Sequence, residues 1–430
     1  MLKVCKFGGS SLCDAAHFMR VREIVLSDVS RRVVVVSAAG KRHSADHKIT
    51  DLLYLCHAHL QYHVSCHELW RRIAGRYIEI RDGCGLYTPI EQSLDQIYAA
   101  LNGAMMQPEL ASRGEYLSAR LMADLLDFSF VDAAQWLQFD SAGNILTDAS
   151  YAALASLADG RKIVTPGFYG VLPSGAIHTF SRGGSDVTGA LAAAALGADV
   201  YENWTDVNGI LAADPHIIQH PQTVPQLTFG ELQALSAVGM QVLHESAVAP
   251  VRQRQIPLHI RSTAHPEQAG TLIRSRCEDC AASSGAIALA GRRGLSMLRL
   301  ELSSGADCSI QLAEANTILR AAGLRVFHSA VSLGQQTFLL DAPRESDTLH
   351  AAAETITRTL QPVQLRLREN LAVLAALCRG AGTASGVLDA VQRAGVPVHH
   401  LAQAASCLLM TVNDSQYEAA LRAAYPVLAK

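Results

Sequence analysis

One stretch near the middle of the chain places strong constraints on what it folds into. Residues 181–186 have the sequence SRGGSD, which joins a cation, two adjacent glycines, a hydroxyl and a carboxylate. The small residues from Ala190 to Leu196 follow and predict a helix that begins near the glycines. Backbone N–H groups at a helix start attract anions, and glycines let the backbone come close to a ligand. The stretch therefore indicates an anion site, with an N-capped helix after a glycine turn as the alternative.

A second glycine-rich stretch lies at the beginning of the chain. The predicted strand Lys3–Phe7 runs into GGSS at 8–11, and a helix with apolar residues at helical spacing follows. Val33–Val36 is a continuous apolar run that suits a buried parallel strand, and it ends at Ser37. This is a βαβ unit, and ligands bind beyond the carboxyl ends of such strands. We therefore expect the segments 6–11 and 37–40 to lie side by side.

The composition excludes several classes of protein. The chain has 430 residues, of which 49% are hydrophobic and 17% charged, which fits a soluble α/β protein of two or three domains. A net charge of −3 gives no basic field for nucleic acid or an acidic membrane. The chain shows no secretory signal, and its ten scattered cysteines indicate reduced thiols. We expect a cytoplasmic protein with neither nucleic acid nor membrane among its partners.

Residues 52–127 predict helices, broken near Gly83-Cys84-Gly85 and Pro89. Thr50 or Asp51 is expected to cap the first of these helices. A later helix is expected to begin at Ser112, which would place Glu115 in its first turn, where a carboxylate favours the helix dipole. After it come a strand near Arg161–Thr165, a hairpin at 173–175, and a strand at 199–204.

Two clusters invite a metal-binding interpretation. His59, His63 and His67 would share one face of a continuous helix, but no carboxylate or catalytic motif accompanies them. Cys277 and Cys280 form a CxxC without a second pair, in a segment expected to be a linker. Neither cluster predicts a metal site.

The composition changes after residue 275. Residues 1–275 predict one large domain, residues 276–290 are rich in Ser, Ala and Gly and predict a linker, and residues 291–430 form a second region. That region shows strand, helix, strand and strand twice. We expect two small α+β units there.

Three blocks together resemble the signatures of the aspartate kinases. They are KFGGSS at 6–11, RGGSD at 182–186 and WTDVNG at 204–209, and their order and spacing match that family. VLH at 242–244 and RST at 261–263 look like further family blocks. The resemblance implies an α/β amino-acid-kinase (carbamate-kinase-like) fold, an αβα sandwich, over residues 1–275. It also implies that residues 291–430 form a regulatory region with two ACT-like domains.

The resemblance implies transfer of the γ-phosphoryl group of Mg-ATP to the β-carboxylate of L-aspartate. This reaction is the first step towards lysine, threonine and methionine. It also implies ATP and Mg²⁺ as cofactors, no protein-bound metal, a lysine or threonine effector at the ACT region, and a homodimer or higher homo-oligomer. Phosphoryl transfer needs positioning and charge neutralisation rather than covalent help from the protein. A carboxylate acceptor is already ionised at neutral pH, so no general base is expected.

The family's site residues are carried over by position. Lys6 would stabilise the transferring phosphoryl group, Arg182 would clamp a substrate carboxylate, and Asp186 would orient Lys6 or the substrate. Glu115 would pair with the substrate ammonium group. The implied catalytic residues are Lys6, Asp186 and Arg182. The implied substrate-binding residues are Ser37, Thr50, Glu115, Arg182, Gly183, Gly184 and Ser185. The implied cofactor-binding residues are Lys6, Phe7, Gly8, Gly9, Ser10, Thr205, Asp206, Leu211, His216 and Gln241.

The chain departs from the family pattern at several of these positions. Many members have tyrosine where Leu211 stands, arginine where His216 stands and lysine where Gln241 stands. Losing two cations is expected to weaken ATP binding. QAAS at 403–406 replaces the usual QGSS, and RGA at 379–381 replaces the usual acidic, glycine-rich turn, so the region expected to bind the effector departs from the family pattern.

Two alternatives remain. Another amino-acid-kinase-fold enzyme, such as an acetylglutamate, glutamate or uridylate kinase, is disfavoured by the ACT-like tail and by WTD at 204–206. A catalytically weak amino-acid sensor of the same fold is favoured by the three departures around the nucleotide. It is disfavoured by the retained Lys6, Glu115, Arg182 and Asp186. Turnover of ATP with aspartate separates the enzyme from the sensor.

Overall fold

The computed structural model describes residues 1–101, 105–181, 183–240, 243, 245–276, 285–302, 308–332, 334–341, 346–379, 381–404 and 406–428. The described residues form two compact units. The first lies within residues 1–210, 223–229 and 241–277, and the second within 211–222, 230–240 and 278–430. The sequence predicted a single domain over 1–275, whereas the structure assigns 211–222 and 230–240 to the second unit. The reason is that Ala213 and Ile218 pack into the core of the C-terminal strands.

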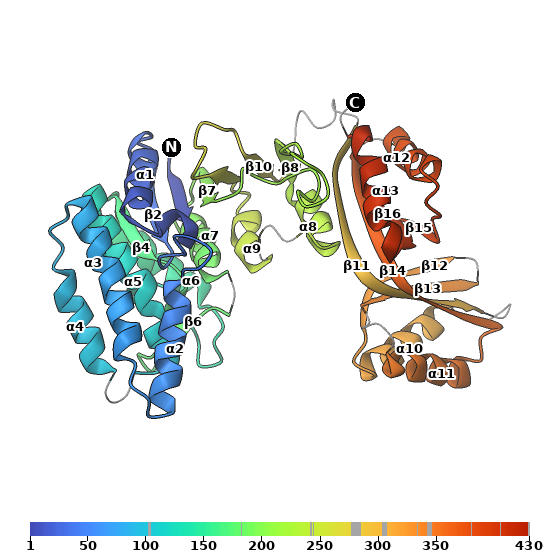
Figure 1. The fold of residues 1–430 in the computed structure, drawn as a ribbon, viewed down its shortest axis with the longest axis horizontal. Coiled ribbons are helices and arrows are strands. Elements are labelled where there is room, and N and C mark those ends of the chain that lie inside the picture. Colours follow the sequence, from blue (N-terminus) through green and yellow to red (C-terminus); the bar gives the residue numbers. More distant parts are fainter. Residues whose placement is uncertain are drawn as a thin grey trace. The chain divides into compact units, whose positions relative to one another are not determined.

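The first unit is built on a sheet whose described strands follow the order β3-β4-β2-β1-β7-β9-β10-β8. Strands β2, β4, β7, β10 and β8 of this sheet are labelled in Figure 1. Strands β4, β2, β1, β7 and β9 pair in parallel in this order, and β10 is antiparallel to β9. The expected βαβ unit at the beginning of the chain is confirmed, because β1 and β2 pair in parallel. The strands of this sheet are β1 (Lys3–Phe7), β2 (Arg31–Val36), β3 (Ser129–Phe130), β4 (Ile163–Pro166), β7 (Val200–Thr205), β8 (Gln226–Thr228), β9 (Leu258–Ser262) and β10 (Thr271–Arg274).

Helices cover both faces of this sheet. On one face, Phe18 and Leu117 pack with the side chains of Val34 and Val36, so the apolar run of β2 is buried as predicted. On the other face, α7 packs against β1, β2 and β7. The helices of this unit are α1 (Ala15–Leu26), α2 (Ile49–Gln61), α3 (His67–Cys84), α4 (Ile90–Ala100), α5 (Gln107–Leu126), α6 (Thr147–Ala158), α7 (Gly184–Ala195) and α9 (Glu245–Gln253).

The segment before α7 forms a small hairpin of β5 (Tyr169–Val171) and β6 (Ile177–Thr179), which are antiparallel. This confirms the turn predicted at 173–175. The hairpin leads the chain from the end of β4 back to the start of α7. It therefore connects two parts of the candidate site.

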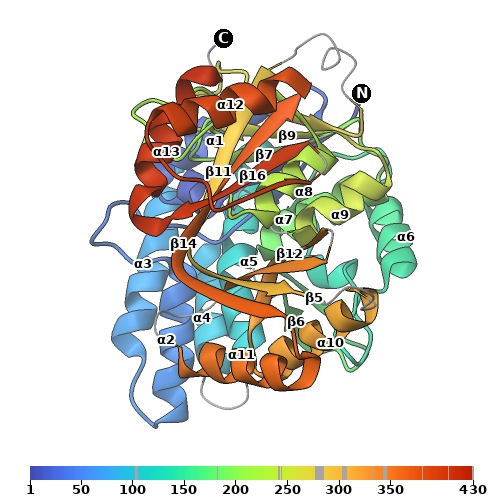
Figure 2. The same ribbon diagram turned by 90° about the vertical axis from the view of Figure 1, so that its right-hand side faces the viewer.

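The second unit contains a sheet whose described strands follow the order β12-β13-β11-β14-β16-β15. Figure 2 shows its long strands β11 and β14. The long strands β11 and β14 pair along most of their length. Two separate apolar cores lie against this sheet, one with α10 and α11 and one with α12 and α13. The elements are α8 (Phe229–Ala237, apart from Phe229), β11 (Gly285–Glu301), α10 (Cys308–Ala321), β12 (Arg325–Ser332), β13 (Gln335–Asp341), α11 (Asp347–Leu360), β14 (Gln364–Arg379), α12 (Ala381–Arg393), β15 (His400–Ala404), β16 (Cys407–Asn413) and α13 (Tyr417–Ala424).

Part of the predicted linker is a strand. Residues 285–290 belong to β11 and pair with β14. Their small side chains suggested a linker, but these residues pair with 375–379 of β14, and close packing requires a glycine at the next position, 291. A Cβ atom on Gly291 would lie 2.4 Å from the ring of Tyr417 in α13. The CxxC at 277–280 lies outside the described residues.

The three histidines at helical spacing do not share a helix face. Helix α2 ends at Gln61, His63 has a left-handed φ of 55°, and α3 begins at His67. In the described part of the chain, the metal-type cluster that does form is Cys13, Asp14 and His17, where Asp14 caps α1. Among the described residues, no helix is both long enough and apolar enough to cross a bilayer.

Candidate active site

The carboxyl ends of β1, β2 and β4 meet at one rim of the first sheet. The N–H of Ser37, after β2, donates to the carbonyl of Phe7 at 3.2 Å, and the N–H of Gly167, after β4, donates to the carbonyl of Val36 at 2.9 Å. The N–H of Gly40 donates to the carbonyl of Gly9 at 2.8 Å. The prediction that the segments 6–11 and 37–40 lie side by side is confirmed.

A side chain is absent at the glycine positions of this rim for two different physical reasons. A Cβ on Gly9 would lie 2.8 Å from the carbonyl oxygen of Ala38, and a Cβ on Gly40 would lie 2.5 Å from that of Gly9, so the two loops interlock. At Gly8, a Cβ would lie 3.4 Å from the Lys6 ammonium group. The missing side chain at Gly8 therefore leaves the Lys6 ammonium group open to a ligand.

The start of α7 packs tightly against the end of β4. Gly183 precedes the helix with a left-handed φ of 58°, and no side chain caps the helix. A Cβ on Gly184 would lie 2.7 Å from the Phe168 ring, and one on Gly167 would lie 2.6 Å from the Cβ of Ser185. The helix start therefore presents backbone N–H groups at the rim without a side-chain cap, which suits an anion.

Lys6 and Asp186 form a pair at the centre of the rim. The Lys6 ammonium lies 2.7 Å from Oδ1 of Asp186, and the Lys6 side chain is 9% exposed. Nδ2 of Asn203 donates to the same Oδ1 at 2.8 Å. Lys6 and Asn203 are register neighbours on β1 and β7, so both side chains point to the face covered by α7. Asp186 therefore holds the ammonium group at the mouth of the glycine loop.

Glu115 is the most unusual acid of the site. It is buried, and its Oε2 has no hydrogen-bond partner among the described residues. Burial raises the pKa of its carboxyl group from 4.5 to about 8, although the N–H of Ala38 and its own N–H favour the ionised form. Ala38 also packs against Gly9, so Glu115 is joined to the glycine loop through one residue. A buried carboxyl group with an open oxygen suits a positively charged partner.

The prediction that Glu115 lies in a first helical turn was wrong. Helix α5 begins at Gln107, with Pro108 near its start, so Glu115 lies in its middle. Glu115 reaches the rim because Gly114 lets α5 approach Ala38, where a Cβ on Gly114 would lie 2.7 Å from that of Ala38. Helix dipole chemistry therefore does not account for the carboxylate at this position.

Thr50 lies in the first turn of α2, and neither it nor Asp51 caps the helix. The helix follows Lys48, which makes no side-chain cap, and the N–H of Ile49 donates to the carbonyl of Ala39 at 3.1 Å. This bond ties the start of α2 to the loop that follows Ser37. Thr50 and Ser37 are both half-buried there. The capping role expected for Thr50 or Asp51 is thus wrong.

The residues expected to contact the nucleotide lie in different parts of the structure: some in the first unit, some in the second, and some outside the described residues. Thr205 ends β7 beside β1, and its hydroxyl donates to Oδ1 of the exposed Asp206 at 3.1 Å. Leu211 and His216 belong to the second unit, where the His216 ring bonds Asp214 at 2.9 Å. Arg182, Gln241, Val242 and His244 lie outside the described residues.

The sequence reasoning missed Asn203. The signal was present, because Asn203 is a polar residue inside the apolar strand β7 and is 3% exposed. Period-two alternation places it on the opposite face from Glu202 and Trp204. A buried amide in such a strand needs a partner, and the partner is Asp186.

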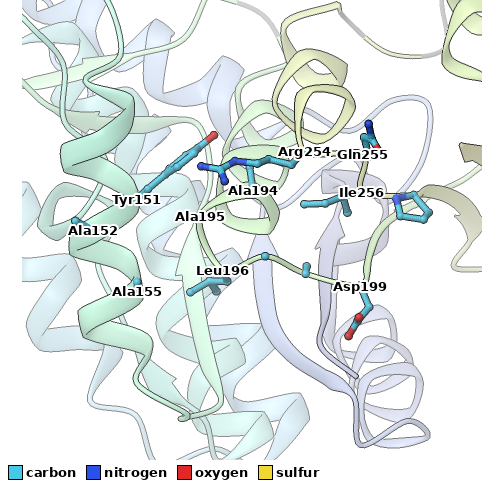
Figure 3. A pocket seen from close by; sticks show the side chains of 13 residues that line it. Tyr151, Ala152, Ala155, Ala194, Ala195, Leu196, Asp199, Arg254, Gln255 and Ile256 are labelled. Atoms are coloured by element: carbon cyan, nitrogen blue, oxygen red, sulfur yellow. The ribbon is translucent and has the colours of Figure 1, made fainter. Parts of the chain in front are cut away.

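A cavity of about 770 Å³ lies at the other end of the strands in the same unit (Figure 3). Alanines of α6 and α7 line it, and Arg254 extends over the ring of Tyr151. It lies next to Asp199, which precedes β7, whereas the Lys6 site lies beyond the carboxyl ends of β1 and β7. None of the predicted site residues lines this cavity.

Comparisons with known proteins agree with this geometry. Residues 1–262 match the model of the amino acid kinase family. The chain is similar to Aspartokinase 3 of Bacillus subtilis, with 30% identity over 99% of this chain and 98% of that protein. Its structure is similar to the aspartate kinase of Clostridium acetobutylicum, with a TM-score of 0.88, 31% identity and 99% of both chains covered. It is also similar to Escherichia coli aspartokinase III in complex with aspartate and ADP, with a TM-score of 0.72, 26% identity and 100% of both chains covered.

Proposed function

The chain belongs to the aspartate kinase family, within the amino acid kinases, and from this premise we propose that it transfers the γ-phosphoryl group of ATP to the β-carboxylate of L-aspartate. The product is 4-phospho-L-aspartate. The observation that carries this proposal is that one rim holds both a buried ammonium group, Lys6 beside Gly8, and a buried carboxyl group, Glu115 beside Ala38, whose Oε2 has no partner among the described residues. One group suits a phosphoryl oxygen and the other suits an amine.

The phosphoryl side of the site is built on β1 and α7. Lys6 neutralises charge on the transferring phosphoryl group, and the backbone N–H groups of Gly8, Gly9 and the start of α7 surround it. Asp186 keeps the ammonium of Lys6 in place in the absence of substrate. Mg²⁺ bound to ATP would supply charge neutralisation at the phosphates, next to Lys6 and the start of α7.

The acceptor side is built on α5, α2 and the loop after β2. Glu115 binds the ammonium group of aspartate, which supplies the partner that its open oxygen lacks. Ser37 and Thr50 donate hydroxyl hydrogen bonds to the aspartate carboxylates. Arg182 clamps a substrate carboxylate through its planar fork, and Gly183, Gly184 and Ser185 bring the helix start close to the substrate. The β-carboxylate attacks as the ionised group, so the site needs no general base.

The nucleotide side begins at the end of β7. Thr205 and Asp206 contact the nucleotide, and Phe7 and Ser10 complete the loop that holds its phosphates. Leu211, His216 and Gln241 replace larger or cationic residues of many family members. We expect the ATP affinity to be lower for this reason, since each lost cation removes a phosphate partner.

An acceptor panel tests the proposed reaction. ADP release is measured with L-aspartate, N-acetylglutamate, glutamate and uridine monophosphate. L-Aspartate is expected to release ADP, because its ammonium group pairs with Glu115. N-acetylglutamate is expected to release little, because its blocked amine leaves Glu115 without a charged partner. Release with N-acetylglutamate in preference to aspartate would contradict the proposal, and no release with any acceptor would favour the amino-acid sensor.

Asn203 is expected to tune the reaction by positioning Asp186. Asn203→Leu removes one of the two hydrogen bonds to Oδ1 of Asp186 and should lower kcat about tenfold, because a hydrogen bond to a charged group contributes about 1.5–3 kcal/mol. The KM for ATP should change little, and the melting temperature checks that the variant is folded at the assay temperature. Asn144→Leu is the control, since the exposed Asn144 donates the same type of bond, amide to carboxylate, to Asp140 at 2.9 Å. An equal loss of kcat in both variants would argue against this role.

The second unit is proposed to be regulatory. Its two α+β halves fit the ACT-like domains that the sequence predicted, and a lysine or threonine effector is proposed to bind there. A relative, E. coli aspartokinase III, has been solved in complex with lysine and aspartate. In this chain, QAAS at 403–406 stands where many family members have QGSS. Deleting the C-terminal region from about residue 290 onward is expected to abolish any feedback inhibition, which a kinetic assay with lysine and threonine measures.

A homodimer is proposed to form through the second unit. Strand β12 is at one edge of its sheet, and Val331 on it is 47% exposed. Strand β15 is at the other edge, and Leu401 on it is also 47% exposed. Exposed edge strands have unpaired N–H and C=O groups that pair with another chain. Sedimentation at micromolar concentration is expected to give the mass of two or more chains, and a monomer would contradict the proposal.

A further inference from the structure

Two histidine side chains meet across the sheet of the second unit. His328 is on β12 and His400 is on β15, and these strands are at opposite edges of that sheet. Their ring centroids nevertheless lie 6.2 Å apart, with the ring planes tilted by 43°. The sheet therefore curves so that side chains from its two edges come together.

The nitrogens of this pair are buried without partners. Nε2 of His328 and Nε2 of His400 are both inaccessible and have no hydrogen-bond partner among the described residues. The same is true of Nε of Arg299 on β11, whose terminal nitrogen donates to the carbonyl of His399 at 3.2 Å. Buried polar groups almost always have partners, so three such nitrogens in one region need an explanation.

A hydroxyl group completes the arrangement. Thr411 on β16 is the register partner of His400, so the two side chains are cross-strand neighbours. Thr411 is fully buried, and its Oγ1 also has no partner within the described chain. We refer to His328, His400, Arg299 and Thr411 as the histidine cluster. All four side chains can present a hydrogen-bond donor.

The pKa values of both histidines in the cluster are lowered. Burial lowers the pKa of His328. Burial, followed by the charges of His328 and Arg299, lowers the pKa of His400. No carboxylate contributes to either pKa among the described residues. The cluster therefore contains three half-buried basic side chains, each with one buried nitrogen that has no hydrogen-bond partner among the described residues.

A second basic contact extends the cluster along β14. Arg299 is the register partner of Arg366, which places two like charges opposite each other. Both line a small cavity of about 70 Å³ together with Gln335, Gln364 and Glu301, and Glu301 is the acidic residue of that lining. An anion between the two guanidinium groups would relieve their repulsion.

We propose that the histidine cluster binds a small oxyanion, either a carboxylate or a phosphate, through Arg299, His328, His400 and Thr411. Such an anion accepts hydrogen bonds from the unpartnered donors and neutralises the guanidinium. Imidazoles are also common metal ligands, but the guanidinium of Arg299 repels a metal cation at this position. The cluster is separate from the Lys6 site, because all its residues belong to the second unit.

Histidine side-chain NMR of the full-length protein tests the proposal locally. Two-dimensional ¹H–¹⁵N imidazole spectra are recorded while inorganic phosphate or acetate is added at constant ionic strength. The signals of His328 and His400, assigned with His328→Gln and His400→Gln, are expected to shift and saturate with one of the two anions. This readout excludes phosphate bound at the Lys6 site, since that unit contains neither histidine. Saturation with phosphate or with acetate identifies which oxyanion the cluster takes.

Substitutions in the histidine cluster test whether its side chains bind the anion. Arg299→Met is expected to weaken the anion affinity at least tenfold, and Thr411→Val is expected to weaken it as well and serves if Arg299→Met does not fold. His350→Gln is the matched control, because His350 is an exposed histidine of α11 whose ring contacts the carbonyl of Ser346. Shifts that stay linear with both anions would overturn the proposal. Saturation of both signals by Zn²⁺ in place of the anions would also overturn it.

Discussion

Lys6→Met is expected to lower kcat by at least about 100-fold, the scale for losing one preorganised group that stabilises developing charge. Lys6 is buried at the rim, and its ammonium lies beside the one position, Gly8, where a missing side chain leaves it open. Methionine has similar length and no charge, so it fills the space without neutralising phosphate oxygens. Steady-state kinetics with ATP and aspartate measures the effect.

The matched control for Lys6→Met is Lys162→Met. Lys162 is exposed, lies before β4 at the other end of the strands, and contacts the Phe128 ring through its ammonium group. This control should keep normal turnover. Lys6→Met is expected to fold, because Asp186 keeps Asn203 as a hydrogen-bond partner. Circular dichroism and the melting temperature test this. Near-normal turnover in a folded Lys6→Met protein would rule out the proposed role of Lys6.

Glu115→Gln is expected to lower kcat/KM for aspartate at least about 100-fold while ATP still binds. The amide keeps the size of the side chain but cannot ionise, so the substrate ammonium group loses its charged partner, and removing one partner of a buried ion pair costs several kcal/mol. Nucleotide binding measured by calorimetry separates this loss from unfolding. Glu109→Gln in the same helix is the control, because Glu109 lies near the start of α5.

The pKa of Glu115 predicts a dependence on pH. Its carboxyl group is protonated below about 8 in the free protein, whereas an ammonium ligand needs the ionised form. The KM for aspartate is therefore expected to fall by about tenfold per pH unit between roughly pH 6 and 7.5, and to level off above about 8. Glu115→Gln should abolish this slope. A KM for aspartate that is flat across this range in the native protein would contradict the assignment.

The same shift affects the free energy of unfolding. The pKa of Glu115 is raised in the folded state, so between 4.5 and about 8 the folded protein holds a proton that the unfolded chain has lost. Stability therefore falls as the pH rises through this window and is constant above it, at a cost on the order of a few kcal/mol. Glu115→Gln removes this cost, so its melting temperature at pH 8.5 should exceed that of the native protein. A lower melting temperature would show that Glu115 has a structural role.

Much of the fold follows from local sequence patterns. The apolar run of β2 and the glycines after β1 are recognisable because burial and tight turns each demand particular residue types at neighbouring positions. The family resemblance implied that Asp186 orients either Lys6 or the substrate, and the Asp186 carboxylate does lie 2.7 Å from the Lys6 ammonium group. In these cases the determining interactions act over a few residues or through a common topology.

Other features depended on contacts between distant segments. Glu115 is buried because Gly114 lets α5 approach Ala38, and nothing within α5 encodes that neighbour. Asn203 has a positioning role only because its side chain meets Asp186, which lies 17 residues earlier, on α7. Residues 285–290 have the composition of a linker, and they form a strand because β14 is available to pair with them.

The sequence by itself therefore determined the family, the parallel strands and the glycine loops, because these depend on residue type and spacing along the chain. The tertiary structure decided the protonation of Glu115, the partner of Asp186 and the assignment of 211–222 to the second unit. It also decided the meeting of His328 and His400 across a curved sheet. Burial and the loss of water around a charged group are properties of the packed chain, and the pattern of residues does not contain them until the chain is folded.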